Sequence, residues 1–166
     1  MRSIDQWLDA YGESHQNPVN KRIHWICVPL IVFSLVGLLW SVPHPFSGLG
    51  AGPWGAWLNW GTLFLLAACV YYVVLSRTLA FGMILIAALV SWGNALLAQA
   101  PAPLWAVSLA IFTAAWIGQF IGHKIEGKKP SFFEDLLFLL IGPLWCLAFL
   151  YTRLGIPYAP PKQRVA

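Results

Sequence analysis

The sequence predicts an all-α integral membrane protein with four transmembrane helices and a broken, re-entrant or interfacial fifth hydrophobic segment. Of its 166 residues, 59% are hydrophobic and only 10% are charged, whereas a soluble domain carries about 25% charged residues. The positive charges lie in short flanks between apolar stretches. Most of these stretches approach the roughly 20 residues that cross a hydrocarbon core. They are Ile23–Val42, Ala56–Leu75, Leu79–Ala98, Leu104–Gly122 and Leu136–Thr152.

The chain is expected to form a single membrane domain, residues 1–166. Residues 1–22 are polar and form a cytoplasmic segment that leads into the first helix. The hydrophobic helices occupy residues 23–152. Residues 153–166 are rich in proline and polar side chains, which is typical of a loose carboxyl tail.

Lysine and arginine define the expected orientation, because they accumulate in short cytoplasmic loops. They occur before the first span, between the second and third, after the fourth, and at the carboxyl end. These residues are Arg2, Lys21, Arg22, Arg77, Lys124, Lys128, Lys129, Arg153, Lys162 and Arg164. If the fifth stretch turns back, all of them are cytoplasmic; if it spans, the last three are not. This distribution favours cytoplasmic termini. The short chain without a retention signal suggests a bacterial inner membrane, and a eukaryotic protein would be expected in the endoplasmic reticulum.

The fifth stretch contains Gly142-Pro143 near its middle, and an internal proline kinks or breaks a helix. Irregular backbone at membrane depth is tolerated where protein buries it. The segment is therefore expected to be broken, re-entrant or interfacial, with an ordinary kinked fifth span as the alternative.

Polar side chains gather where the first span begins. Asn17 followed by Pro18 is typical of an N-cap and a first helical residue. Asn20 and His24 then share one helix face at i and i+4, while His15 precedes the cap.

A second polar group lies where the fourth span ends. Gln119, His123 and Glu126 are spaced i, i+4 and i+7, so they form one stripe if the helix continues. Gly127 is expected to end that helix.

Both groups come to the cytoplasmic side of their spans, so His15, His24 and His123 can meet. His44 falls at the opposite face, roughly 30 Å away across the hydrocarbon, and is interpreted as a loop residue. Converging imidazoles suit iron, copper, nickel or zinc, and two histidines with a carboxylate suit non-haem Fe(II). The alternative is that these side chains bond lipid headgroups or cap helix ends. The scattered positive charges do not indicate nucleic-acid binding.

Two motifs carry a resemblance to a known family. The segments YGESHQNPVNKRIHWICVPLI and QFIGHKIEGKKPS resemble the Mpo-like family of small membrane proteins, over most of the chain in layout. The resemblance implies an Fe(II)-dependent dioxygenase that shortens 2-hydroxy fatty acids by one carbon. It implies the following site residues: His15, His24 and His123 as ligands, accompanied by Asn17, Asn20, Gln119 and Glu126.

The implied reaction converts a 2-hydroxy acid and O₂ to the shortened acid, CO₂ and water, and so needs no outside electrons. No dinucleotide or phosphate-loop motif occurs. The implied partners are the 2-hydroxy fatty acid, O₂ and membrane lipids. Two other functions remain open: bis-histidine haem ligation by His24 and His123 in electron transfer, or a non-enzymatic lipid-binding, transport or assembly factor.

Glu126 admits three roles. It could be a fourth metal ligand, an acceptor that orients an imidazole N–H, or a solvated partner of Lys128 and Lys129.

Overall fold

The computed structural model describes residues 2–45, 57–131 and 136–158, and within these ranges the chain forms six α-helices. They are α1 (Ile4–Glu13), α2 (Pro18–Trp40), α3 (Trp60–Leu75), α4 (Arg77–Leu97), α5 (Leu104–Glu126) and α6 (Phe138–Arg153).

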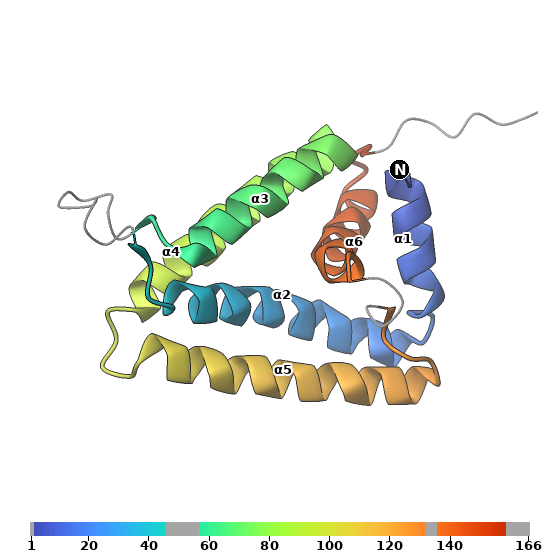
Figure 1. Cartoon of the computed structure of the whole chain (residues 1–166). Coiled ribbons are helices and arrows are strands. Elements are labelled where there is room, and N and C mark those ends of the chain that lie inside the picture. The colour runs from blue at the N-terminus through green and yellow to red at the C-terminus, as the bar shows by residue number, and fades with distance from the viewer. Residues whose placement is uncertain (1, 46–56, 132–135, 159–166) are drawn as a thin grey trace, which may run out of the picture.

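Two antiparallel pairs form the body of the molecule (Figure 1). Helix α2 packs mainly against α5, and α3 packs against α4. The α3–α4 pair is inclined to the α2–α5 pair, so the two pairs diverge toward one end of the molecule. Helix α6 lies in the opening between them, and α1 stands across the same end, where the amino terminus of α2 and the carboxyl terminus of α5 meet. The first and last helices of the chain are therefore neighbours.

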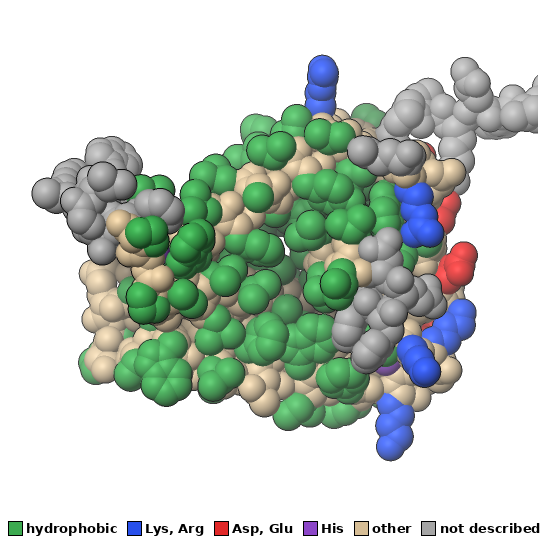
Figure 2. All heavy atoms as spheres, in the orientation of Figure 1, with side chains coloured by type: hydrophobic (Ala, Val, Ile, Leu, Met, Phe, Trp, Pro, Cys, Tyr) green, Lys and Arg blue, Asp and Glu red, His purple; other side chains and the backbone are tan. Residues whose placement is uncertain are grey.

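Three of the described helices, α2, α4 and α5, are long and apolar enough to cross a membrane. Helices α3 and α6 are apolar but have only 16 residues each. Large apolar side chains such as Leu66, Val70 and Leu89 are exposed on the outside of the bundle. Figure 2 shows hydrophobic atoms over most of the visible surface, with most charged side chains gathered at the end that carries α1. These features identify an integral membrane protein.

Helix boundaries near the polar motifs agree with the sequence. The Asn17 side chain caps α2 by accepting a hydrogen bond from Val19 N, and Pro18 is the first helical residue. Gly127 ends α5 in the left-handed region at φ 74°, a conformation that costs glycine little. The second predicted span starts later than expected, at Trp60, because Asn59 and Thr62 form a capping box there.

Of the three forms predicted for the fifth hydrophobic segment (broken, re-entrant or interfacial), the broken form is absent. Helix α6 is continuous from Phe138 to Arg153 and contains Pro143. Proline removes one N–H from the helix ladder, and neighbouring side chains can satisfy backbone groups near such a site. The hydroxyl of Tyr72, on α3, donates to the Leu140 carbonyl at 2.9 Å.

Both ends of α6 lie at the α1 end of the bundle. Its first residue, Phe138, packs edge-on against Trp7 of α1, with ring centroids 5.2 Å apart. Beyond its last residue, Arg153, the Tyr158 carbonyl accepts a hydrogen bond from Ser76, between α3 and α4. Residues 159–166 of the predicted loose tail lie outside the described residues.

The polar amino-terminal segment contains a helix that the sequence analysis did not predict. Ser3 and Gln6 form a capping box at the start of α1. Ile4, Trp7, Leu8 and Tyr11 are buried on one face, at the i, i+3, i+4 and i+7 spacing of an amphipathic helix. This face packs against α6.

Candidate metal centre

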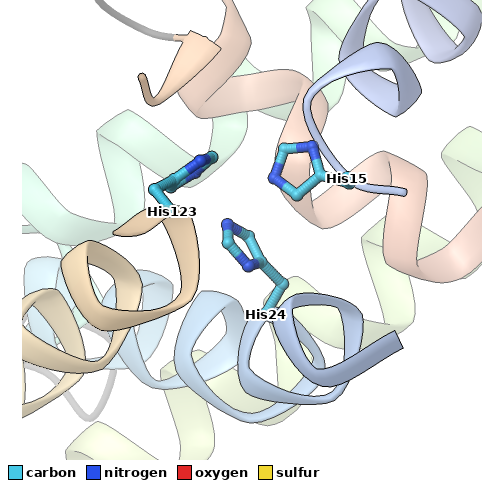
Figure 3. Close-up of side chains that lie close together, drawn as sticks. All are labelled: His15, His24 and His123. Carbon is cyan, nitrogen blue, oxygen red and sulfur yellow. The ribbon is translucent and has the colours of Figure 1, made fainter. Parts of the chain in front are cut away.

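Three histidines from three separate elements converge at the α1 end of the bundle (Figure 3). His15 lies between α1 and α2, His24 is in α2, and His123 is in the last turn of α5. One ring nitrogen from each lies within 4.8 Å of the other two. The three side chains, called the histidine cluster below, are at most 5% exposed. The sequence-based prediction that these three histidines meet is confirmed.

His15 is held from both sides. Its Nδ1 lies 2.6 Å from the Tyr11 carbonyl, and its ring stacks on the Tyr11 ring at a centroid distance of 4.2 Å. Trp145 of α6 lies 5.5 Å away, centroid to centroid. Because Nδ1–H donates to Tyr11, Nε2 carries the free lone pair. It is buried and has no hydrogen-bond partner among the described residues.

His24 is oriented in the same way within α2. Its Nδ1 lies 3.0 Å from the Asn20 carbonyl, one turn earlier, which leaves Nε2 as its ligand atom. In His123, Nδ1 is buried without a hydrogen-bond partner in the described part of the chain. Metal-bound histidines usually donate their second ring N–H to a carbonyl or carboxylate. His15 and His24 therefore have the hydrogen bonds expected of metal ligands.

The protonation of His15 also suits a metal. Burial lowers the pKa of His15 to about 4, although the Tyr11 carbonyl opposes this shift. The ring is therefore neutral at physiological pH, as a metal-binding imidazole must be.

Glu126 anchors the backbone that carries His15. Its carboxylate accepts hydrogen bonds from Gln16 N at 2.8 Å, Asn17 N at 2.9 Å and Asn20 Nδ2 at 3.0 Å. These bonds join the end of α5 to the α1–α2 connection. Glu126 lies outside the group of potential ligands formed by the histidine cluster, and its bonds differ from the three roles considered from the sequence.

Asn17 and Asn20 support the same connection. Asn17 caps α2, and Asn20 Nδ2 also donates to the Ser14 carbonyl at 3.3 Å. Gly122 lets α5 approach Asn20, because a Cβ there would collide with Asn20 Oδ1.

Gln119 instead faces the histidine cluster. A cavity of about 50 Å³ contains Gln119 and all three histidines in its lining. The Gln119 side chain is 5% exposed, and its Nε2 has no hydrogen-bond partner among the described residues. A buried donor without a partner is costly, so Nε2 is available to a ligand in this cavity.

Several residues around the cluster were missed by the sequence analysis. Tyr11 and Trp145 contact the His15 ring, and Ser14 lies 2.5 Å from Ser131, oxygen to oxygen, and 3.2 Å from His15 Nδ1. The amphipathic spacing in α1 could have indicated Tyr11. No spacing rule links Ser14 to Ser131, which is 117 residues away.

His44 is separated from the cluster by the length of α2. His24 lies near the start of this helix, which ends at Trp40, and 16 residues of helix span about 24 Å.

The fold and the histidine cluster define a class: a helical membrane protein with a buried three-histidine site that can hold a metal ion. A family model described as 2-hydroxy-palmitic acid dioxygenase Mpo1-like matches residues 1–154. The chain therefore belongs to the Mpo1-like family of 2-hydroxy fatty acid dioxygenases.

A curated relative extends this comparison. The chain is 29% identical over 151 residues to the 2-hydroxy-palmitic acid dioxygenase MPO1 of Saccharomyces cerevisiae, an alignment that covers 89% of this chain and 79% of that protein. No solved structure matches the chain.

Proposed function

We propose that this protein is an Fe(II)-dependent dioxygenase that removes one carbon, as CO₂, from 2-hydroxy fatty acids within the membrane. The observation that carries the proposal is the histidine cluster, with ring nitrogens within 4.8 Å of one another. Imidazole also suits zinc, copper and nickel, so the choice of iron rests on the dioxygenase family. Bound Fe(II) would supply the redox chemistry with O₂.

The residues of this chain would hold the metal and the polar head of the acid. His15 Nε2, His24 Nε2 and His123 Nδ1 would bind the metal, because each is the ring nitrogen that faces the cluster or lacks a partner. Gln119 Nε2 would donate to the carboxylate or hydroxyl of the acid. Apolar side chains such as Val28, Ile31 and Phe138 form much of the remaining cavity lining.

The size of the cavity favours a metal ion over haem. The space around the histidine cluster is about 50 Å³, whereas cofactor sites usually enclose about 300–1,000 Å³. The bis-histidine haem alternative therefore receives no support from the geometry.

Metal analysis and turnover test the proposed function together. Protein purified in mild detergent should contain close to one iron per chain and release CO₂ from 2-hydroxypalmitic acid only when O₂ is present. Palmitic acid, which lacks the hydroxyl, is the matched control. A chelator should abolish turnover, and Fe(II) should restore it. Full turnover by iron-free protein would refute the proposal.

Gln119→Leu tests recognition of the head group. Leucine keeps the size of the side chain but removes the donor. A hydrogen bond to a charged group contributes about 1.5–3 kcal/mol, so KM should rise about 10- to 100-fold, at 1.4 kcal/mol per factor of ten. Iron content should stay at the wild-type level. Gln99→Leu is the control, because Gln99 is exposed beyond the end of α4. An unchanged KM in Gln119→Leu would remove Gln119 from the binding site.

The topology we propose has α2, α3, α4 and α5 crossing the membrane, with α1, α6 and both termini on the cytoplasmic side. The Ser76–Tyr158 hydrogen bond supports it, because it brings the end of α6 to the α3–α4 junction. All ten Lys and Arg residues then lie on the side expected of short cytoplasmic loops.

Reporter fusions check this topology in a bacterial inner membrane. Green fluorescent protein should fluoresce at either terminus, and alkaline phosphatase should be inactive at both. An active phosphatase at the carboxyl terminus would mean that α6 crosses the membrane.

A further inference from the structure

A larger apolar chamber lies next to the histidine cluster. It has a volume of about 360 Å³ and is enclosed by side chains from α2, α3, α4, α5 and α6, which is within the usual range for ligand sites. Figure 2 shows the molecule hollowed between α2 and the α3–α4 pair. Its lining is aliphatic or aromatic apart from a few polar atoms, among them the Tyr72 hydroxyl, which is bonded to Leu140. The chamber therefore suits hydrocarbon and offers little to a polar head group.

The chamber and the metal-site cavity share a wall. Ile31, Val32, Trp116 and Leu139 line both. Ile31 and Val32 follow His24 by two turns of α2, and Trp116 precedes His123 by two turns of α5. At 1.5 Å per residue these positions are about 10–12 Å from the two histidines along the helices. A ligand whose head lies at the cluster would reach the chamber past these four side chains.

We propose that this chamber receives the alkyl tail of the 2-hydroxy acid, and that its α4 wall limits the length of the tail. The proposal rests on the function proposed above and adds the determinant of chain length. Lipid tails are as apolar as the chamber wall, so a tail that leaves the bilayer gains little from the hydrophobic effect. Selection then depends on whether the tail fits the space.

Two neighbouring alanines on α4 lie at the boundary between the chamber and the outer surface. Ala87 is half-buried and lines the chamber, although it also borders a groove between α3 and α4. Ala88 is exposed and lines that groove but not the chamber. A larger side chain at Ala87 would occupy the chamber, and the same side chain at Ala88 would point to lipid.

Ala87→Phe and Ala88→Phe form the matched pair for the test. For each variant, kcat/KM is measured with 2-hydroxydecanoic and 2-hydroxyhexadecanoic acid, together with iron content. One methylene in an apolar pocket changes discrimination about 10- to 200-fold, so Ala87→Phe should shift the ratio toward the shorter acid by at least about tenfold. Ala88→Phe should keep the wild-type ratio, and both should keep their iron.

The outcomes distinguish the two proposals. A wild-type protein that turns over neither acid refutes the proposed function. A wild-type protein that is active, with the same length preference in Ala87→Phe as in Ala88→Phe, refutes the chamber alone.

Photo-crosslinking of the wild-type protein provides a readout that depends on neither a variant nor turnover. A 2-hydroxy acid with a diazirine near its methyl end should label chamber residues such as Leu65, Ala68 and Met83. Labelling confined to the exposed, outward-facing Val70, Val74 and Leu85 would place the tail in bulk lipid and overturn the proposal.

Discussion

Replacing any one of His15, His24 or His123 with alanine is expected to remove the bound iron and to reduce CO₂ release below one hundredth of the wild-type rate. Each variant loses one of three ligands from a buried site. This loss should exceed the roughly 10- to 100-fold effect of removing a group that only supports a ligand. Metal analysis and CO₂ release from 2-hydroxypalmitic acid measure the two effects.

His44→Ala is the control for the histidine variants. His44 lies beyond the far end of α2, and a substitution away from the site typically changes free energies by less than about 0.5 kcal/mol. Iron content and turnover should therefore stay within about twofold of wild type. An inactive His44→Ala together with an active His123→Ala would contradict both the metal site and the topology.

Glu126→Gln is expected to lower activity about 10- to 100-fold, as loss of a supporting partner does, and to weaken iron retention. The glutamine keeps one acceptor oxygen, but its NH₂ group would replace the other and face a donor, because Gln16 N and Asn17 N bond different oxygens of the carboxylate. The connection that carries His15 would then lose part of its attachment to α5. Added Fe(II) should partly restore turnover, because His15 itself remains.

Glu13→Gln is the matched control for Glu126→Gln, because it also removes one carboxylate charge. Glu13 is exposed at the end of α1, on the same side of the molecule as Glu126. The hydrogen bonds from the backbone N–H groups of residues 16 and 17 go to Glu126 and not to Glu13. Iron retention and turnover should match wild type. Wild-type iron and turnover in Glu126→Gln would show that the Glu126 bonds to residues 16, 17 and 20 are dispensable for the site.

The sequence predicted those parts of the site that depend on local geometry. The Asn17 cap, the end of α5 at Gly127, and the common depth of His15, His24 and His123 all follow from helix rules and the distribution of charge. The partners of Glu126 could not be predicted in this way, because they lie 106 to 110 residues away in sequence. Such contacts depend on how the helices pack in three dimensions.

Two elements of the fold were also not predictable from the local sequence. The helix continues through Pro143, because the effect of an internal proline depends on the surrounding helices, which the local sequence does not describe. Helix α1 was missed because a ten-residue helix is marginal alone in water. Its stability depends on packing against α6.

The contact between α1 and α6 has a consequence for biosynthesis. The His15 ring rests on Trp145, and α1 packs on Phe138, so α6, which follows His15 by more than 120 residues in the sequence, helps to position it. Domains generally begin folding from the amino terminus during synthesis, yet the His15 ring gains its contact with Trp145 only after α6 has been made and joins the bundle. A chain truncated before α6 would therefore keep the Glu126 bonds of the segment that carries His15 but would lose the packing of Trp145 on the His15 ring.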